Sequence, residues 1–253
     1  MRAIFRRFVS AIWKALASRV TMTSVKLLIP LLLLSPVRVF AEQDYVGRFD
    51  IYNGFAWFDS PSANLTERGY HLQAGVNVRT WLAAGFDFSV VQGNVTLVPQ
   101  LLNPALQSQI GGQLAALQGA GLLPAGYRVA VGTSSTTQTF AAGPQWEYRH
   151  FRRVTFFAHP SIGAIHESAT PHASDPLTAG LVRQLAPSGV IKDWEPFYGL
   201  GGGFELRVLR HGTVRIQADY VHNDLFPNLL KGPRNTVRLS VGPAIQFGKN
   251  VTR

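Results

Sequence analysis

The chain has 253 residues, with 24 Lys and Arg against 14 Asp and Glu, a formal charge of +10, and 46% apolar residues. This apolar content excludes an intrinsically disordered chain. The absence of Cys excludes disulfides, Cys-ligated metal centres and a Cys nucleophile. A charge of +10 favours nucleic acid or an anionic membrane surface as the partner, unless the basic residues gather in one segment.

The basic residues do gather at the start of the chain. Seven of them precede residue 42 without any acidic residue, a short Leu-rich run follows over 27–34, and small residues end the segment at Val39-Phe40-Ala41. This order predicts a secretory signal peptide over 1–41, with Met22 as a possible true start. An uncleaved anchor is the alternative, but the run is short for a spanning helix and contains Pro30. The remaining chain, 42–253, has 17 bases against 14 acids, a charge of about +3, which removes the case for nucleic acid.

Beyond residue 41, apolar and polar residues alternate in segments of about ten, which predicts strands. In Gly69–Arg79, for example, Tyr70 and Leu72 belong to one face, and His71 and Gln73 belong to the other. The eight predicted strands are Arg48–Phe58, Gly69–Arg79, Leu82–Val90, Thr139–Tyr148, Val154–Gly163, Tyr198–Val208, Val214–Tyr220 and Val237–Phe247.

Short and long connections alternate between these strands. The tight ones are Arg79–Trp81, Arg149–Arg153 and Leu209–Thr213, and the long ones are Asp59–Arg68, Val95–Gln138, His166–Trp194 and His222–Arg234. Outer-membrane barrels have this asymmetry, with short periplasmic turns and longer outer loops. The second outer loop contains a predicted helix, Pro104–Ala120, with Asn103 as its N-cap. Its apolar stripe serves either as a lid on the barrel rim or as a contact surface, and residues 127–138 extend the fourth strand.

Alternation alone does not say which face of a barrel points inward, so a soluble lipocalin-like barrel is the competing prediction. Three features favour a membrane: small residues dominate the polar faces, aromatic residues lie near strand ends as in interfacial girdles, and the predicted signal peptide permits export. The predicted interfacial aromatics are Trp57, Trp81, Trp146, Tyr148, Trp194, Tyr198 and Phe247.

With this pattern the chain resembles the small outer-membrane β-barrel proteins of the OmpA/OmpX type, the outer membrane protein β-barrel domain, over roughly Tyr45–Phe247. The best local match is the last strand, Asn235–Phe247, although six residues follow the terminal aromatic of the pattern. The resemblance implies an all-β fold: an eight-stranded antiparallel transmembrane up-and-down β-barrel over 42–253, with a short helix in the second outer loop. It also implies location in the outer membrane, with outer-membrane lipid, lipopolysaccharide and the barrel assembly machinery as partners.

If the apolar faces meet lipid, the polar faces fill the lumen. They carry a predicted charge network of Asp50, Arg79, Asp87, Glu147, Arg149, Glu205, Arg207, Arg215, Asp219 and Arg238. Five acids and five bases can neutralise one another, and an eight-stranded barrel is narrow enough for side chains to fill it. We therefore expect a plugged lumen, with an ion path or gate as the alternative.

The predicted role is structural or surface-interacting and non-enzymatic, for a monomer with an unknown extracellular ligand, no cofactor and no metal. A small-pore porin is the first alternative. A second is a barrel that modifies lipid A, because His166 and Ser168 resemble the His-x-Ser pair of the lipid A 3-O-deacylases. The parity of the neighbouring carboxylates opposes it: Glu195 and Glu167 should both point inward, away from His166.

Overall fold

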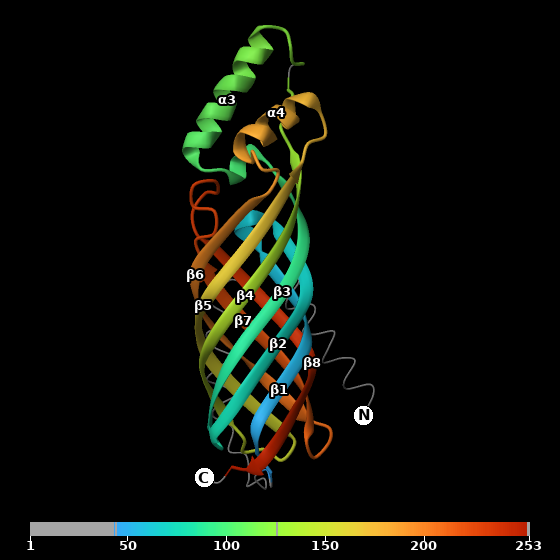
Figure 1. Cartoon of the computed structure of the whole chain (residues 1–253), viewed down its shortest axis with the longest axis vertical. Helices are drawn as coiled ribbons and strands as arrows, with labels where there is room; N and C mark the ends of the chain where they lie inside the picture. Colours follow the sequence, from blue (N-terminus) through green and yellow to red (C-terminus); the bar gives the residue numbers. More distant parts are fainter. Residues whose placement is uncertain (1–42, 44, 125, 252–253) are drawn as a thin grey trace, which may run out of the picture. The chain divides into compact units, whose positions relative to one another are not determined.

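A computed structural model describes residues 43, 45–124 and 126–251, so the predicted signal peptide over 1–41 lies outside the described residues. Eight strands form one closed antiparallel ring, in which each strand pairs with the next and β8 pairs with β1 (Figure 1). The strands are β1 (Gly47–Ser60), β2 (Leu65–Arg79), β3 (Leu82–Leu97), β4 (Val131–Tyr148), β5 (Val154–His172), β6 (Ile191–Arg207), β7 (Gly212–Asn223) and β8 (Arg234–Asn250). The predicted eight-stranded up-and-down barrel is confirmed.

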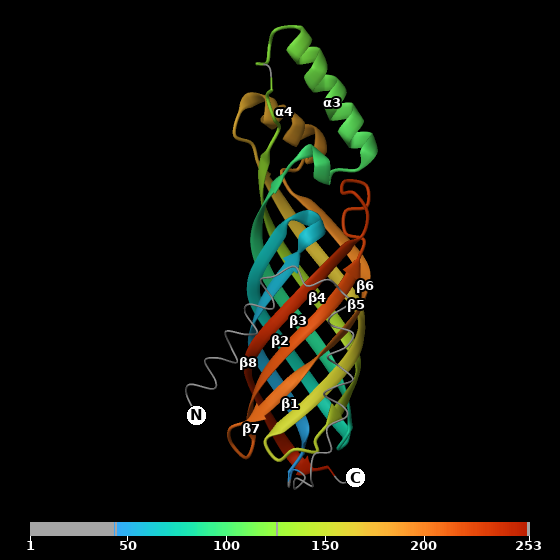
Figure 2. The ribbon, with the colours of Figure 1, turned by 180° about the vertical axis from the view of Figure 1, so that it is seen from behind.

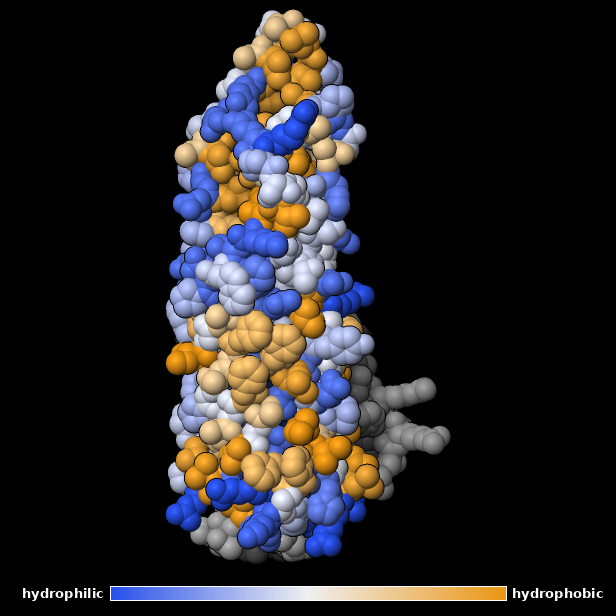
Figure 3. All heavy atoms as spheres, in the orientation of Figure 1, coloured by the Kyte–Doolittle hydropathy of each residue, from blue (hydrophilic) through white to orange (hydrophobic). Residues whose placement is uncertain are grey.

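The polar faces of the strands are buried inside the ring and the apolar faces are exposed outside it, which is the reverse of the arrangement in a soluble protein. Arg215 and His71 are completely buried inside the ring, whereas Ile162, Tyr70 and Leu200 on its outer face are 72%, 70% and 64% exposed. Apolar side chains cover much of the lower barrel surface, above a hydrophilic lower edge (Figure 3). A lipocalin-like barrel would place its apolar side chains inside, so this arrangement decides against that alternative.

The connections divide the barrel into two ends, best compared in the two opposite views (Figure 2). The turn end carries the three tight turns, 80–81, 149–153 and 208–211. The loop end carries the remaining connections and the helices. One expectation about the loop end was wrong: the β1–β2 connection is short, because the strands continue to Ser60 and resume at Leu65 around the 3-10 helix η1 (Pro61–Ala63). Asn64 closes it in the left-handed region, with φ of 50°.

The strands at the loop end are longer than predicted. β4 begins at Val131, in agreement with the expected extension over 127–138. β5 continues to His172 and β6 already begins at Ile191, so His166 and Trp194 lie in paired strands and the connection between these strands is shorter than His166–Trp194.

Two helices cover the loop end (Figure 1). After the 3-10 helix η2 (Pro99–Leu101), α3 (Pro104–Gly119) begins as predicted, with the Asn103 side chain accepting the backbone N–H of Leu106. The sequence reading missed α4 (Pro176–Leu185), which Asp175 caps. None of the helices in the described part of the chain is long and apolar enough to cross a membrane.

The helices form a lid with its own apolar core. Ile110 of α3 and Leu181 of α4 pack with Leu102, Val129 and Val131, all buried. We call the segments 98–124, 126–130 and 173–190 the lid. This core accounts for the predicted apolar stripe of α3. Ile110 is buried in it, Leu106 and Leu114 are half-buried against it, and the opposite side of the helix is exposed.

Candidate functional site: the barrel interior

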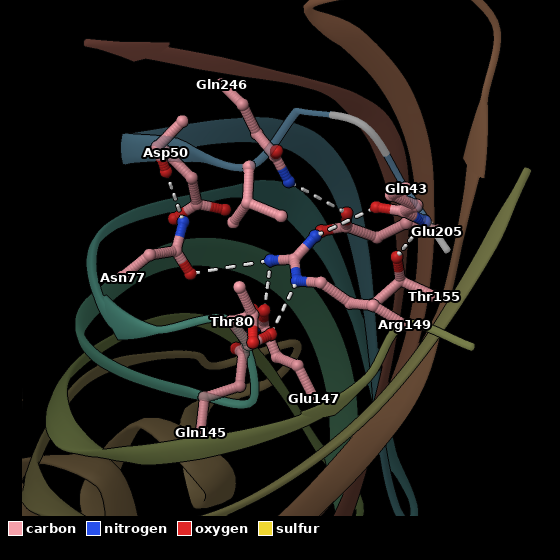
Figure 4. Close-up of polar contacts among 12 residues, drawn as sticks. Gln43, Asp50, Asn77, Thr80, Gln145, Glu147, Arg149, Thr155, Glu205 and Gln246 are labelled. Carbon is pink, nitrogen blue, oxygen red and sulfur yellow. Dashed lines mark hydrogen bonds and ion pairs between the residues drawn. The ribbon is translucent and has the colours of Figure 1, made fainter. Parts of the chain in front are cut away.

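The interior nearest the turn end is organised around Arg149 (Figure 4). Its guanidinium forms an ion pair with Glu147, and it donates to the backbone oxygen of Thr80 over 3.0 Å and to the side-chain oxygens of Gln43 and Asn77, each over 3.4 Å. These partners come from β4, β2, the β2–β3 turn and the segment before β1. One arginine therefore hydrogen-bonds to several separate segments of the chain.

Amide side chains connect Arg149 to a second arginine. Gln145 donates to Glu147 over 2.7 Å, and Gln73 donates to Gln145 over 3.2 Å. Gln73 in turn accepts from Arg215 over 2.7 Å. The result is a continuous hydrogen-bonded chain across the barrel.

Arg215 on β7 is the most enclosed charge of the interior, with no exposed surface. It forms ion pairs with Glu205 of β6 and Asp50 of β1. The rings of Tyr52 and Phe157 lie on it, each with its centroid 5.2 Å from the guanidinium carbon. A buried arginine is tolerated only when such partners replace its water shell.

Arg238 on β8 is the centre of a third cluster. It binds both carboxylate oxygens of Asp87 over 2.7 Å and donates to Asp219 over 2.7 Å. Two histidines complete the cluster: His71 Nε2 lies 2.5 Å from Asp87, and His159 Nε2 lies 3.0 Å from Asp219.

A glycine on β6 provides the space for this cluster. A Cβ atom at Gly201 would lie 1.8 Å from the Asp219 carboxylate and 2.7 Å from His159 Nε2. Real Cβ atoms do not approach other atoms so closely. The Gly-rich run 199–203 is therefore explained in part by the room that charged side chains need, as expected for glycine within a strand.

Closer to the loop end the interior changes character. Glu67 and Glu167 both approach the Ser135 hydroxyl, at 3.0 and 2.9 Å, and Arg234 forms an ion pair with Glu167. Beside them lies an apolar cluster, which comprises Ala141, Ile165, Ala169, Phe197, Val221, Leu225, Phe226 and Leu230. Toward the loop end, the interior thus combines an apolar cluster with a smaller charged group.

The structure assembles eight of the ten predicted charge-network residues inside the barrel. They are Asp50, Asp87, Glu147, Arg149, Glu205, Arg215, Asp219 and Arg238, all buried. Arg79 does not belong there: the β2–β3 pairing shifts register between Asn77 and Arg79, and this shift leaves Arg79 exposed at the turn. Arg207 lies at the mouth of the turn end, where it donates to Gln43 and to the Tyr45 carbonyl over 2.8 Å.

The expected balance of five acids and five bases is not what the interior contains. Among the described residues, seven acidic side chains and four arginines are buried. The residues that the sequence reading left out are Glu67, Glu167, Arg234, His71 and His159. Both histidines alternate with outward apolar residues in predicted strands, so this alternation could have assigned them to the barrel interior.

The seven predicted interfacial aromatics all lie on the outer surface of the barrel wall, with exposures between 39% and 62%. Trp81, Trp146, Tyr148 and Phe247 lie toward the turn end, and Phe247 packs against Phe49 with ring centroids 5.6 Å apart. Trp57 and Trp194 lie toward the loop end, and Tyr198 follows two outward positions below Trp194. Such rings suit the two borders of a bilayer, where one edge of the ring is apolar and the other meets water.

The His166–Ser168 pair has the position predicted for it but no carboxylate partner. His166 Nδ1 lies 2.7 Å from the backbone oxygen of Asp193, and its ring stacks on Trp194 with centroids 4.5 Å apart. Glu167 points inward to Arg234, as its parity predicted. Within 43, 45–124 and 126–251, no group of three or more acidic and His residues is arranged to hold a metal ion.

No family model matches the sequence, and no curated protein gives a significant match. Solved structures do match it. Neisserial surface protein A has 10% identity and a TM-score of 0.46 over 79% of this chain and 96% of that chain. Ail, the attachment invasion locus protein of Yersinia pestis, solved with the heparin analogue sucrose octasulfate, has 14% identity and a TM-score of 0.43 over 79% and 99%. The outer membrane protein OprG from Pseudomonas aeruginosa has 10% identity and a TM-score of 0.43 over 82% and 99%. At these identities the likeness concerns the fold alone.

The chain's own geometry defines its class. A closed antiparallel ring with an apolar outer face and a filled polar interior is a transmembrane β-barrel of the outer-membrane type. The expected resemblance to the small OmpA/OmpX-type barrels and the expected location in the outer membrane are confirmed. In this class the tight turns face the periplasm and the longer loops face outward.

Proposed function

We propose that this barrel is closed to ions and that it serves as a structural or surface-contact protein of the outer membrane, without enzymatic activity. The observation that carries the proposal is the interior network. Hydrogen bonds and ion pairs run without interruption from Gln43 through Arg149, Gln73 and Arg215 to Asp50.

The dimensions of the barrel support closure. An eight-stranded ring has an interior just wide enough for side chains to fill. A cavity between the interior and the wall, beside Gly143 and Pro160, measures about 10 Å³, which is the room of about one water molecule. An ion that crossed this interior would have to displace buried, paired charges.

The lid is the part we assign to surface contact. It lies at the loop end, which faces outward in this class, and α3 contains no charged residue. The side of α3 that faces away from the apolar core of the lid is exposed. In this proposal the partners are outer-membrane lipid, lipopolysaccharide and the barrel assembly machinery. The protein acts as a monomer, and its extracellular ligand is unknown.

Bilayer recordings test the closure. The full chain, purified from outer membranes and reconstituted in a planar bilayer, should give no steady unitary conductance. The matched variant replaces both members of the central pair, Arg215→Ala with Glu205→Ala, which keeps the net charge and opens space. It should conduct more than the wild type. Its electrophoretic mobility should still change on heating, which shows that the variant barrel is folded. Steady conductance in the wild type would contradict closure and favour a small-pore porin.

Lipid A analysis tests the absence of enzymatic activity. Cells that express the wild type and cells that express Ser168→Ala should contain lipid A of identical mass. A mass loss that requires Ser168 would show deacylation and would contradict the non-enzymatic assignment.

A further inference from the structure

The turn end carries a pocket of about 440 Å³ whose walls are rich in arginine. Arg152 and Arg153 come from the β4–β5 turn, Arg210 comes from the β6–β7 turn, and Arg207 ends β6. A backbone hydrogen bond of 2.8 Å from Arg207 to the Arg153 carbonyl holds the two turns together. The four guanidinium groups therefore belong to one concave site instead of four separate surface positions.

Among the described residues, no Asp or Glu lines this pocket. The turn-end segments 45–48, 79–81, 149–153, 208–212 and 248–251 contain no Asp or Glu. Arg152, Arg153 and Arg210 are exposed, and Arg210 lies over the ring of Tyr45, 5.8 Å from its centroid. A concave cluster of like charges concentrates an electrostatic potential that attracts an anion.

The position of the pocket indicates where the anion comes from. Val208 and Leu209 line it and are 67% and 69% exposed, although they are apolar. Directly along the outer wall follow Leu206 and Phe156, 40% and 46% exposed, on the face that meets lipid. Hydrophilic and hydrophobic surfaces also adjoin along the lower edge of the face that Figure 3 shows. An anion at the arginines would thus have an apolar path immediately beside it.

We propose that the pocket binds the phosphate of an anionic phospholipid, of the phosphatidylglycerol class, from the membrane leaflet at the turn end. The arginines take the phosphate, because guanidinium groups match its geometry. The acyl chains lie along Leu206 and Phe156. Basic pockets at the border of a membrane bind anionic lipid headgroups in the same way. The site does not depend on whether the lumen conducts.

Native mass spectrometry of the full chain in a neutral detergent tests this site. The probes are phosphatidylglycerol, phosphatidylcholine with the same acyl chains, inorganic phosphate and a soluble peptidoglycan fragment. The wild type should retain one phosphatidylglycerol in preference to phosphatidylcholine, and less of it as the salt concentration rises. Arg153→Gln combined with Arg210→Gln should weaken this binding roughly thirtyfold, at about fivefold for each arginine lost near an anionic headgroup.

The matched control removes the same charge from the other end of the barrel. Arg68→Gln combined with Arg128→Gln affects exposed arginines of the loop end and should leave phosphatidylglycerol binding unchanged. Equal retention of phosphatidylglycerol by the turn-end variant and the wild type would overturn the proposal. Competition by inorganic phosphate at the same concentration as the lipid would reduce the site to a free-anion site. Binding of the peptidoglycan fragment without phosphatidylglycerol would assign it to the cell wall.

Discussion

The two halves of the barrel interior are closed by different chemistry. Near the turn end, most of the buried side chains that cross the lumen are charged or carry amides, with Arg215 and Arg238 at the centres and the rings of Tyr52 and Phe157 on Arg215. Near the loop end, Phe197, Leu225 and their neighbours form an apolar cluster below a lid with an apolar core of its own. A charged network depends on every partner, whereas apolar packing weakens in proportion to the atoms removed. The two halves should therefore respond differently to substitution.

The largest effect is expected at the centre of the charged half. Arg215→Met leaves Glu205 and Asp50 buried without their shared partner, and breaking a buried ion pair from one side costs about 3–5 kcal/mol. The free energy of unfolding in urea, measured in lipid vesicles, should fall by this amount. Arg210→Met at the exposed β6–β7 turn is the control and should change it by less than about 0.5 kcal/mol.

A second substitution distinguishes a broken network from a lost contact. When Glu205→Gln is added to Arg215→Met, one uncompensated carboxylate disappears, so part of the lost stability should return. If the double variant is as unstable as the sum of its single variants, the two residues do not act as a pair.

Substitutions in the apolar half should lower the unfolding free energy less than those in the charged half. Leu225 is completely buried beside Phe226 and Leu230. Leu225→Ala should lower the unfolding free energy by about 2–3 kcal/mol, in the lower part of the range for such truncations, because the surrounding loop can collapse on the cavity. Leu122→Ala, at a position 71% exposed in the lid, should change it by less than about 0.5 kcal/mol. Equal losses in both variants would mean that the cluster contributes nothing specific.

The contrast between the halves also explains what the sequence could predict. Where a strand crosses the bilayer, one of its faces meets lipid and is apolar, so period-two alternation shows both the strand and its inward face. Tyr70 and His71 are an example, with Tyr70 exposed and His71 buried. Beyond the bilayer both faces of a strand are polar, and the signal disappears. For this reason β2 was predicted to begin at Gly69, and Glu67, at an inward position on the extended strand, was assigned to a loop.

The sequence did not show which charged residues would pair with each other. Asp87 and Arg238 were both placed on inward faces, but they are 151 positions apart in the chain. Their contact follows from ring closure and strand register, which no local pattern contains. The helix α4 was a different kind of omission. Asp175-Pro176 with Thr178 is a readable start signal, since the Asp175 and Thr178 side chains form a capping box.

The acidic side chains of the loop-end half give a smaller and more diagnostic prediction. No Arg or His in the described part of the chain forms an ion pair with Glu67, which accepts only from Ser135 and Thr137, whereas Glu167 is paired with Arg234. Glu67→Gln should raise the unfolding free energy by about 1 kcal/mol, because it removes an uncompensated buried charge. Glu167→Gln should lower it, because Arg234 loses its partner. The same sign for both substitutions would contradict this distinction.

The smallest loss of stability is expected when the N-cap of α4 in the lid is removed, and the barrel strands should keep their stability. Asp175 accepts the backbone N–H groups of Leu177 and Thr178 over 3.0 Å and the Tyr127 hydroxyl over 3.0 Å. The backbone hydrogen bond from Thr178 lowers the pKa of Asp175 below its ordinary value, and the Tyr127 hydroxyl adds to this. A lowered pKa means that the cap contributes fully above the ordinary pKa of Asp, near 4, and is lost as the pH falls through the lower value of the folded chain.

Hydrogen-exchange protection of the Leu177 and Thr178 amides, corrected for intrinsic rates, should therefore decrease at acid pH. In Asp175→Ala it should be low at every pH, whereas Asp175→Asn, which keeps an acceptor oxygen, should retain much of it without the acid step. Protection of the barrel strands should be the same in all three proteins, because α4 packs with the lid core and the charged half of the interior lies far from it along the strands. A loss of protection in β6 or β7 on removal of this cap would show that the two halves are coupled.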